Sequence, residues 1–178
     1  MRPHAQLVMK PLDDRTLVMT RSFDAPRALV FRCWTEPELL RRWLSGPDGW
    51  TFTVCEVDLR VGGAYRYVWH WEGPVCEPTG SDCAEQPIDM GMRGEFRSVD
   101  RPGGFVATEC FDQSWYPGEA VVQHEFVELE GRTYYTGTVT YESAEALQAV
   151  LRSGMEQGVS VSYNRLDGLL AEQLTQAA

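Results

Sequence analysis

The C-terminal stretch, residues 143–174, most constrains how this chain can fold. Its apolar residues recur at steps of three and four, which places them on one face of an α-helix. Ser143 is a suitable N-cap, and Glu145 puts a negative charge in the first turn, where the helix dipole favours it. We therefore expect one long amphipathic helix, whose apolar face the rest of the chain must cover. That face comprises Leu147, Val150, Leu151, Met155, Val159, Ser162, Leu166, Leu169 and Leu170.

Small residues interrupt this apolar face. Gly154, Gly158 and Ser162 follow one another at steps of four, and a glycine inside a helix costs about 1 kcal/mol relative to alanine. Two interpretations stay open. Either another backbone packs very closely against the helix there, or the missing side chains leave open space beneath it.

The middle of the chain, residues 50–141, is a series of strands separated by Gly, Pro and Asp turn signals. Most connections are short enough for hairpins, which predicts an antiparallel meander. The exception is residues 73–87, too long and too polar for a tight turn and therefore expected as a surface loop insertion. The six expected strands span about residues 51–60, 63–72, 89–99, 104–112, 120–129 and 132–141.

The N-terminal third supplies one more strand and two short helices. Residues 16–23 alternate closely enough for a strand. One helix should follow Asp24 and Pro26 and run through Trp34, and residues 35–38 look like the capping box of a second. The order strand, two helices, six strands, long helix predicts an α+β fold with a curved seven-stranded antiparallel sheet wrapped around the C-terminal helix. A cavity is expected between sheet and helix.

The 178 residues fit one domain with its own core. We expect a flexible N-terminal tail over residues 1–14, a single domain over residues 15–174 and a frayed end over residues 175–178. A core of this size needs neither a disulfide nor a metal to be stable. The sequence leaves a homodimer open.

The net charge of −10 argues against nucleic acid and anionic membrane surfaces as partners, because both are bound through clustered Lys and Arg. Residues 1–15 have no apolar core of signal-peptide length, and no apolar run approaches the roughly 20 residues of a membrane span. We therefore expect a soluble cytoplasmic protein.

Neither metal nor cofactor is expected. Cys33, Cys55 and Cys110 lie in apolar segments and are expected in the core, whereas Cys76 and Cys83 in the loop lack the spacing of a zinc site. The sequence contains no nucleophile elbow, P-loop or dinucleotide fingerprint.

A catalytic signature is missing as well. His124 and Glu125 begin like a zinc-protease motif, but the motif ends in Glu128 rather than His, and alternation in a strand sends the first two to opposite faces. Catalytic residues stay unknown and the enzyme question open, with a binding protein favoured. Two acids inside the pocket could still act as acid and base, but the sequence does not show which acids point inward.

Aromatic and methionine side chains mark the candidate ligand site. Tyr65, Tyr67 and Trp69 alternate on one strand face and are expected to point toward the C-terminal helix. The alternative is an ordinary core, but flat rings with flexible methionines suit a planar apolar ligand with one or two polar handles. The candidate ligand-binding residues are Trp43, Phe52, Tyr65, Tyr67, Trp69, Met90, Met92, Phe96, Phe111, Trp115, Met155, Gly158, Val159 and Ser162.

Five segments together resemble the family named after the activator of the Hsp90 ATPase, within the START-like, helix-grip superfamily. The resemblance implies a β-α-α-β6-α domain with a deep pocket between the sheet and the final helix. The loop at residues 73–87 departs from it, being longer than family members usually have there. The five segments are RSFDAPRALVF (21–31), WTEPELLRRWL (34–44), VGGAYRY (61–67), GEFRSVDRP (94–102) and GMEQGV (154–159).

Three functions follow from the pattern and the resemblance. We favour a binding protein for a small hydrophobic or aromatic molecule. The second is an interaction module that activates an Hsp90-type chaperone, although we expect no additional N-terminal domain like that of the namesake activator. The third, a cyclase or hydratase acting on polyketide-like substrates, would need a polar pair inside the pocket.

Overall fold

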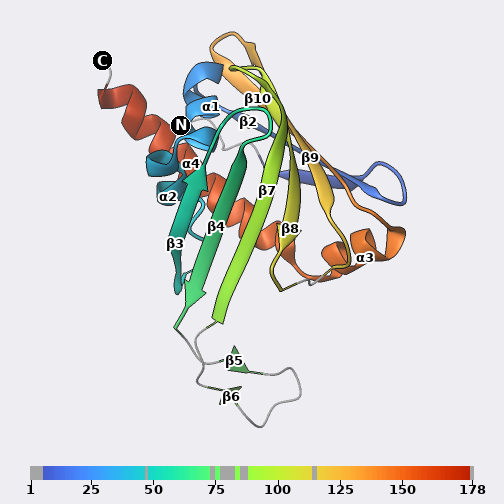
Figure 1. Ribbon diagram of the computed structural model, residues 1–178. Helices are drawn as coiled ribbons and strands as arrows, with labels where there is room; N and C mark the ends of the chain where they lie inside the picture. Colours follow the sequence, from blue (N-terminus) through green and yellow to red (C-terminus); the bar gives the residue numbers. More distant parts are fainter. Residues whose placement is uncertain are drawn as a thin grey trace.

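The computed structural model describes residues 6–46, 48–72, 75–76, 83–84, 88–113 and 116–176. In this part of the chain an eight-stranded antiparallel sheet, in the order β1-β2-β10-β9-β8-β7-β4-β3, is crossed on one face by the C-terminal helix α4 (Figure 1). The helices are α1 Arg27–Thr35, α2 Pro37–Trp43, α3 Ala144–Arg152 and α4 Met155–Gln176. The strands of this sheet are β1 Val8–Pro11, β2 Thr16–Phe23, β3 Trp50–Val57, β4 Ala64–Trp71, β7 Ile88–Asp100, β8 Gly104–Phe111, β9 Ala120–Leu129 and β10 Arg132–Thr140.

The α+β helix-grip architecture is confirmed, and the six strands from β3 to β10 that form this sheet lie close to their expected positions. The sheet has one strand more than the seven expected, because β1 lies within the segment expected as a tail. It pairs antiparallel with β2, with Met9 opposite Met19. A strand of four residues shows no periodicity of its own, and its pairing with the edge of β2 is a tertiary interaction.

The expectation of one unbroken C-terminal helix is wrong. The helix breaks between α3 and α4 at Gly154, whose φ of 75° is one that L side chains rarely adopt. Ser153 stabilises the break, because its hydroxyl donates to the Val150 carbonyl at 2.7 Å and accepts from the Met155 amide at 3.2 Å. Ser143 is the N-cap of α3, as expected, and accepts from the Ala146 amide at 3.1 Å.

The capping box expected at residues 35–38 does not form. Thr35 is the last residue of α1, and its hydroxyl donates to the Phe31 carbonyl at 2.9 Å. Glu36 is the N-cap of α2 without a side-chain hydrogen bond, and Pro37 opens that helix. Helix α2 contacts both α4 and β3, so the corner formed by α1 and α2 closes one end of the sheet (Figure 1).

A buried ion pair fixes α4 against the sheet. Arg21 of β2 pairs with Asp167 and donates to Asn164 Oδ1 at 2.9 Å, both on α4. Its guanidinium also lies 5.8 Å from the ring centroid of Tyr163. Removing one partner of such a pair leaves a charge without its counterion in a poorly solvated place, which is costly. The pair therefore links α4 to β2 and favours the helix orientation in which Asp167 and Asn164 face Arg21.

Two remaining expectations concern the cysteines and the loop. Cys33 and Cys55 are buried, and burial raises the pKa of their thiols to about 12 and about 11. Within residues 73–87 the described backbone forms two short strands, β5 Val75–Cys76 and β6 Cys83–Ala84, which pair antiparallel. The side chains of Cys76 and Cys83 and the rest of this loop lie outside the described residues.

Among the described residues, no helix is both long and apolar enough to cross a membrane.

Candidate ligand-binding site

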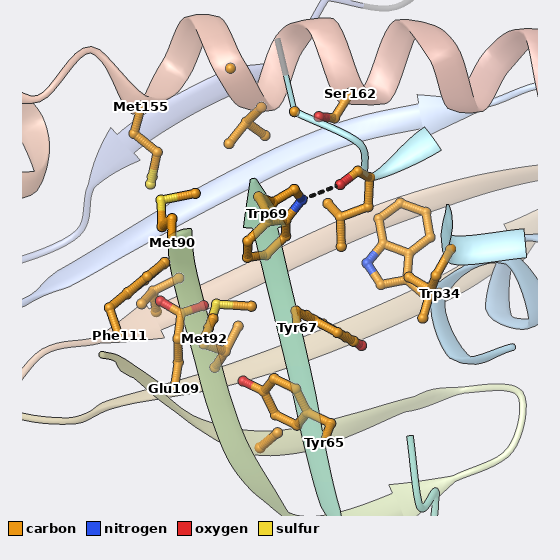
Figure 2. A pocket seen from close by; sticks show the side chains of 18 of the residues that line it. Trp34, Tyr65, Tyr67, Trp69, Met90, Met92, Glu109, Phe111, Met155 and Ser162 are labelled. Carbon is orange, nitrogen blue, oxygen red and sulfur yellow. Dashed lines mark hydrogen bonds between the residues drawn. The ribbon is translucent and has the colours of Figure 1, made fainter. Parts of the chain in front are cut away.

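A cavity of about 920 Å³ lies between the sheet and α4. Its walls are the inward-facing side chains of β4, β7, β8, β9 and β10, and its roof is the inner face of α4 (Figure 2). This volume falls within the range of small-molecule sites, about 300–1,000 Å³. Gln113 and Ser153 belong to the lining and are also exposed, so the cavity opens near the end of β8 and the α3–α4 break.

The rings of β4 form one wall. Tyr65, Tyr67 and Trp69 are all buried and face the cavity from alternate positions of the strand (Figure 2). The Trp69 indole donates to the Leu44 carbonyl at 2.6 Å, and the Tyr65 hydroxyl donates to the Thr108 carbonyl at 2.7 Å. Because both polar atoms are already bonded to backbone, these two rings offer the cavity mainly their apolar surface.

The roof of the cavity explains one of the glycines. A Cβ atom built on Gly158 would meet nothing within 4 Å, and Gly158 lines the cavity beside Val159 and Ser162. Open space, and not close backbone packing, is therefore the correct interpretation at this position. Gly154 serves the helix break instead.

Twelve of the fourteen candidate residues lie in the cavity wall. Phe52 does not, because its ring stacks behind Trp69 with centroids 5.0 Å apart and planes 10° from parallel. Trp115 lies outside the described residues. The twelve are Trp43, Tyr65, Tyr67, Trp69, Met90, Met92, Phe96, Phe111, Met155, Gly158, Val159 and Ser162.

Glu109 of β8 is a cavity residue that the sequence reasoning missed. Its Oε1 accepts a hydrogen bond from the Tyr116 hydroxyl at 3.0 Å, and in Figure 2 its carboxyl lies beside Met92 and Phe111. Burial raises the pKa of this carboxyl to about 7, because the charged form loses most of its hydration. The signal was present: alternation along β8 puts Glu109 on the same face as Phe111.

His124 of β9 is the second missed polar residue. Its Nδ1 is 3.0 Å from the Tyr135 hydroxyl, and its ring packs against Phe105 with centroids 4.4 Å apart. Burial lowers the pKa of this imidazole to about 3, so the ring is neutral at physiological pH. His124 and Glu125 lie on opposite faces of the strand, as the sequence predicted, and the structure places His124 inward and Glu125 outward.

The two polar residues stand at different places along the cavity. Glu109 lies opposite Ala120 and Phe105 lies opposite His124 in the β8–β9 ladder. Four strand residues therefore separate the two positions, which is about 13 Å at 3.3–3.4 Å per residue. Glu109 and His124 thus lie in two different regions of the cavity, with aromatic and methionine side chains between them.

The lining carries little charge. Among its described residues there is no Lys or Arg, and Glu109 is the sole carboxyl. Nor do the described residues contain any group of three or more His, Cys, Asp or Glu that could hold a metal ion. The site can enclose an apolar body and can exchange hydrogen bonds or a proton at Glu109.

Comparisons with known proteins support the same fold. The family model described as Activator of Hsp90 ATPase homolog 1-like protein matches residues 24–171. A crystal structure from Rhodobacter sphaeroides is 28% identical, covers 94% of this chain and 99% of its own, and superposes with a TM-score of 0.80. One from Mycobacterium smegmatis is 32% identical, with coverages of 92% and 96% and a TM-score of 0.73.

A more distant structure is an HSP90 activator from Plasmodium falciparum. It is 21% identical, covers 81% of this chain and 89% of its own, and has a TM-score of 0.53, which supports the shared fold alone. No curated protein matches the sequence.

Proposed function

The chain belongs to the family of Activator of Hsp90 ATPase homolog 1-like proteins, and we propose that this member binds a small, planar, largely apolar molecule between its sheet and α4. The observation that carries the proposal is the cavity of about 920 Å³ beneath Gly158. A helix-interior glycine over open space costs helix stability without improving the packing. Such a cost is understandable if the space is used by a ligand.

The shape of the ligand follows from the wall. Tyr67, Trp69 and Trp34 present ring surface, and flat rings pack best against other flat rings. Met90 and Met155 bring flexible thioether side chains that adapt to ligands of different outline (Figure 2). A planar molecule of a few fused rings matches both features.

Binding is favoured over catalysis. A general acid or base has to reach the proton it transfers, within about 3 Å or through one water. Glu109 and His124 lie about 13 Å apart along the ladder, too far to act on the same atom. Tyr116 is close to Glu109, but burial and the neighbouring carboxyl raise its pKa, so it serves as a hydrogen-bond donor. The cyclase or hydratase alternative therefore cannot use Glu109 and His124 together as its polar pair.

Native mass spectrometry of protein purified from its own host tests the proposal. We expect a complex heavier than the chain by the mass of one small molecule, which denaturing conditions release. Gly158→Leu protein, prepared in parallel, should lack the added mass because the leucine side chain projects into the cavity where the ligand would lie against α4. An unliganded wild-type mass, with no uptake of planar aromatic compounds added afterwards, would contradict it.

Activation of an Hsp90-type chaperone is the second candidate. The family description favours it, and the outer face of the β9–β10 hairpin exposes Val127, Leu129 and Tyr134. It ranks second because a stable protein interface needs about 800 Å² per partner, and these three side chains form a small patch. Chaperone ATPase rates measured with wild-type protein and with Val127→Glu decide it: stimulation lost in the variant would support this function, and no stimulation by either would exclude it.

A further inference from the structure

We propose that the ligand carries a basic amine, bound as an ammonium ion by the carboxylate of Glu109, and that ligands bearing a carboxylate are rejected. The inference rests on the proposed function and names the chemical class for the same cavity. Its starting point is that the described lining combines one carboxyl with no Lys or Arg.

One carboxylate oxygen of Glu109, Oε2, is available to bind a ligand. Tyr116 donates to Oε1 at 3.0 Å, and no described residue hydrogen-bonds to Oε2. The side chain keeps some accessible surface although it lies inside the fold, because it faces the cavity. A carboxylate in an apolar cavity is stabilised most by a cation that also donates hydrogen bonds to it. An ammonium group provides both.

The surroundings of Glu109 favour a cation over an anion. The titratable groups that feel its charge from neighbouring elements are Tyr65 on β4, Tyr116 after β8, and Tyr135 and Tyr141 at β10 and just beyond it. Burial raises the pKa of all four, so they are neutral at physiological pH. Ring faces attract cations, whereas an anionic ligand would meet a carboxyl with no compensating positive charge. The net charge of −10 adds to that discrimination.

A protonation linkage follows. Burial holds the pKa of Glu109 at about 7, so about half the empty protein carries a protonated carboxyl at that pH. An ammonium ligand favours the ionised form, so its binding releases protons near neutrality. Below pH 7 the carboxyl is protonated and the preference for the amine should fade. A neutral ligand of the same shape should show no such pH dependence.

Three probes with one planar body test the inference on the intact protein: 2-naphthylmethylamine, 2-ethylnaphthalene and 2-naphthylacetate. At pH 8 we expect wild type to bind the amine about tenfold more tightly than the ethyl compound, and the acid about tenfold more weakly. Glu109→Gln should bind the amine and the ethyl compound equally, because the amide keeps the size and the acceptor for Tyr116.

Tyr116→Phe is the matched control, because it removes a hydrogen bond to the carboxyl and keeps the carboxyl itself. Since that hydrogen bond lowers the pKa of Glu109, the variant should keep the amine preference and show it only at higher pH than wild type. Measuring the amine preference of wild type across a series of pH values tests the link to the ionised carboxyl of Glu109 without a variant.

Equal binding of the amine and ethyl probes by wild type, or an amine preference that survives in Glu109→Gln, would overturn the amine assignment and leave the proposed function standing. Binding of the acid as tightly as the amine would do the same. Failure of wild type to bind any of the three probes would overturn the proposed function itself, and this inference with it.

Discussion

Glu109 on β8 and His124 on β9 face one cavity from neighbouring strands, and burial shifts the pKa of each side chain so that its neutral form is favoured. The pKa of the carboxyl rises to about 7 and that of the imidazole falls to about 3. The common cause is loss of hydration, which penalises the charged form of an acid and of a base alike. The two groups therefore make the stability of the protein depend on pH in opposite directions.

Glu109→Gln should raise stability relative to wild type as the pH increases. Between its ordinary pKa of 4.5 and the raised value of about 7, the native state binds more protons at Glu109 than the unfolded state, so the unfolding free energy falls with rising pH. The amide does not titrate. Urea unfolding at pH 5.5 and 8 should show the variant gaining roughly 1–3 kcal/mol on wild type at the higher pH. Parallel curves would show that this carboxyl is well hydrated.

His124→Asn should change how stability depends on pH on the acidic side. As the pH falls from 6.5 toward about 3, His124 binds a proton in the unfolded state, whereas the buried ring of the native state stays neutral. Wild type therefore loses stability on acidification. The asparagine variant loses the hydrogen bond with Tyr135 and starts lower, but its stability should fall less between pH 7 and 5.5. A slope equal to that of wild type would contradict burial of the ring.

Two glycines of α4 form a matched pair for testing the cavity. Neither Gly158 nor Gly168 has any atom within 4 Å of a built Cβ, but only Gly158 lines the cavity, whereas Gly168 is exposed. Leucine at either position should raise helix stability by up to about 1 kcal/mol. Binding of a planar fluorescent probe should be lost in Gly158→Leu and kept in Gly168→Leu. Unfolding of the first variant alone would mean tight packing where the structure has open space.

Alanine substitutions at Gly154 and Gly158 should have effects of opposite sign. The φ of 75° at Gly154 makes a side chain unfavourable there, and Gly154→Ala should cost about 1–2 kcal/mol. Gly158 has ordinary helical geometry, and Gly158→Ala should gain about 1 kcal/mol. Thermal melts of both variants measure the difference. Stabilisation in both would mean that the helix runs through Gly154 unbroken.

The sequence was informative where the structural signal is local. Alternation and short turns located the strands from β3 to β10 within the sheet, and helical periodicity identified the inner face of α4. It was not informative where partners come from far away. β1 became visible only through its pairing with β2, and the buried Arg21 only through Asp167, 146 positions along the chain.

In the candidate site, too, local patterns were predictable from the sequence and other features were not. The rings of β4 could be assigned to the cavity because their alternation is visible in the sequence. Gly154 and Gly158 could not be told apart, because the difference between them is a backbone angle and not a residue type. Glu109 could have been found from its position two residues before Phe111, once that ring was placed inward. What no local pattern shows is that the described residues of this lining include a single carboxyl and no Lys or Arg.

Thermal unfolding of wild type and of Gly158→Leu, each with and without a planar apolar compound such as 2-ethylnaphthalene, tests the central claim most directly. At a concentration 100 times the dissociation constant, the ligand should stabilise wild type by about 2.7 kcal/mol, which raises the midpoint by several degrees. Gly158→Leu should not respond. An unchanged wild-type midpoint across a panel of planar compounds, or equal shifts in both proteins, would contradict a ligand-binding cavity beneath α4.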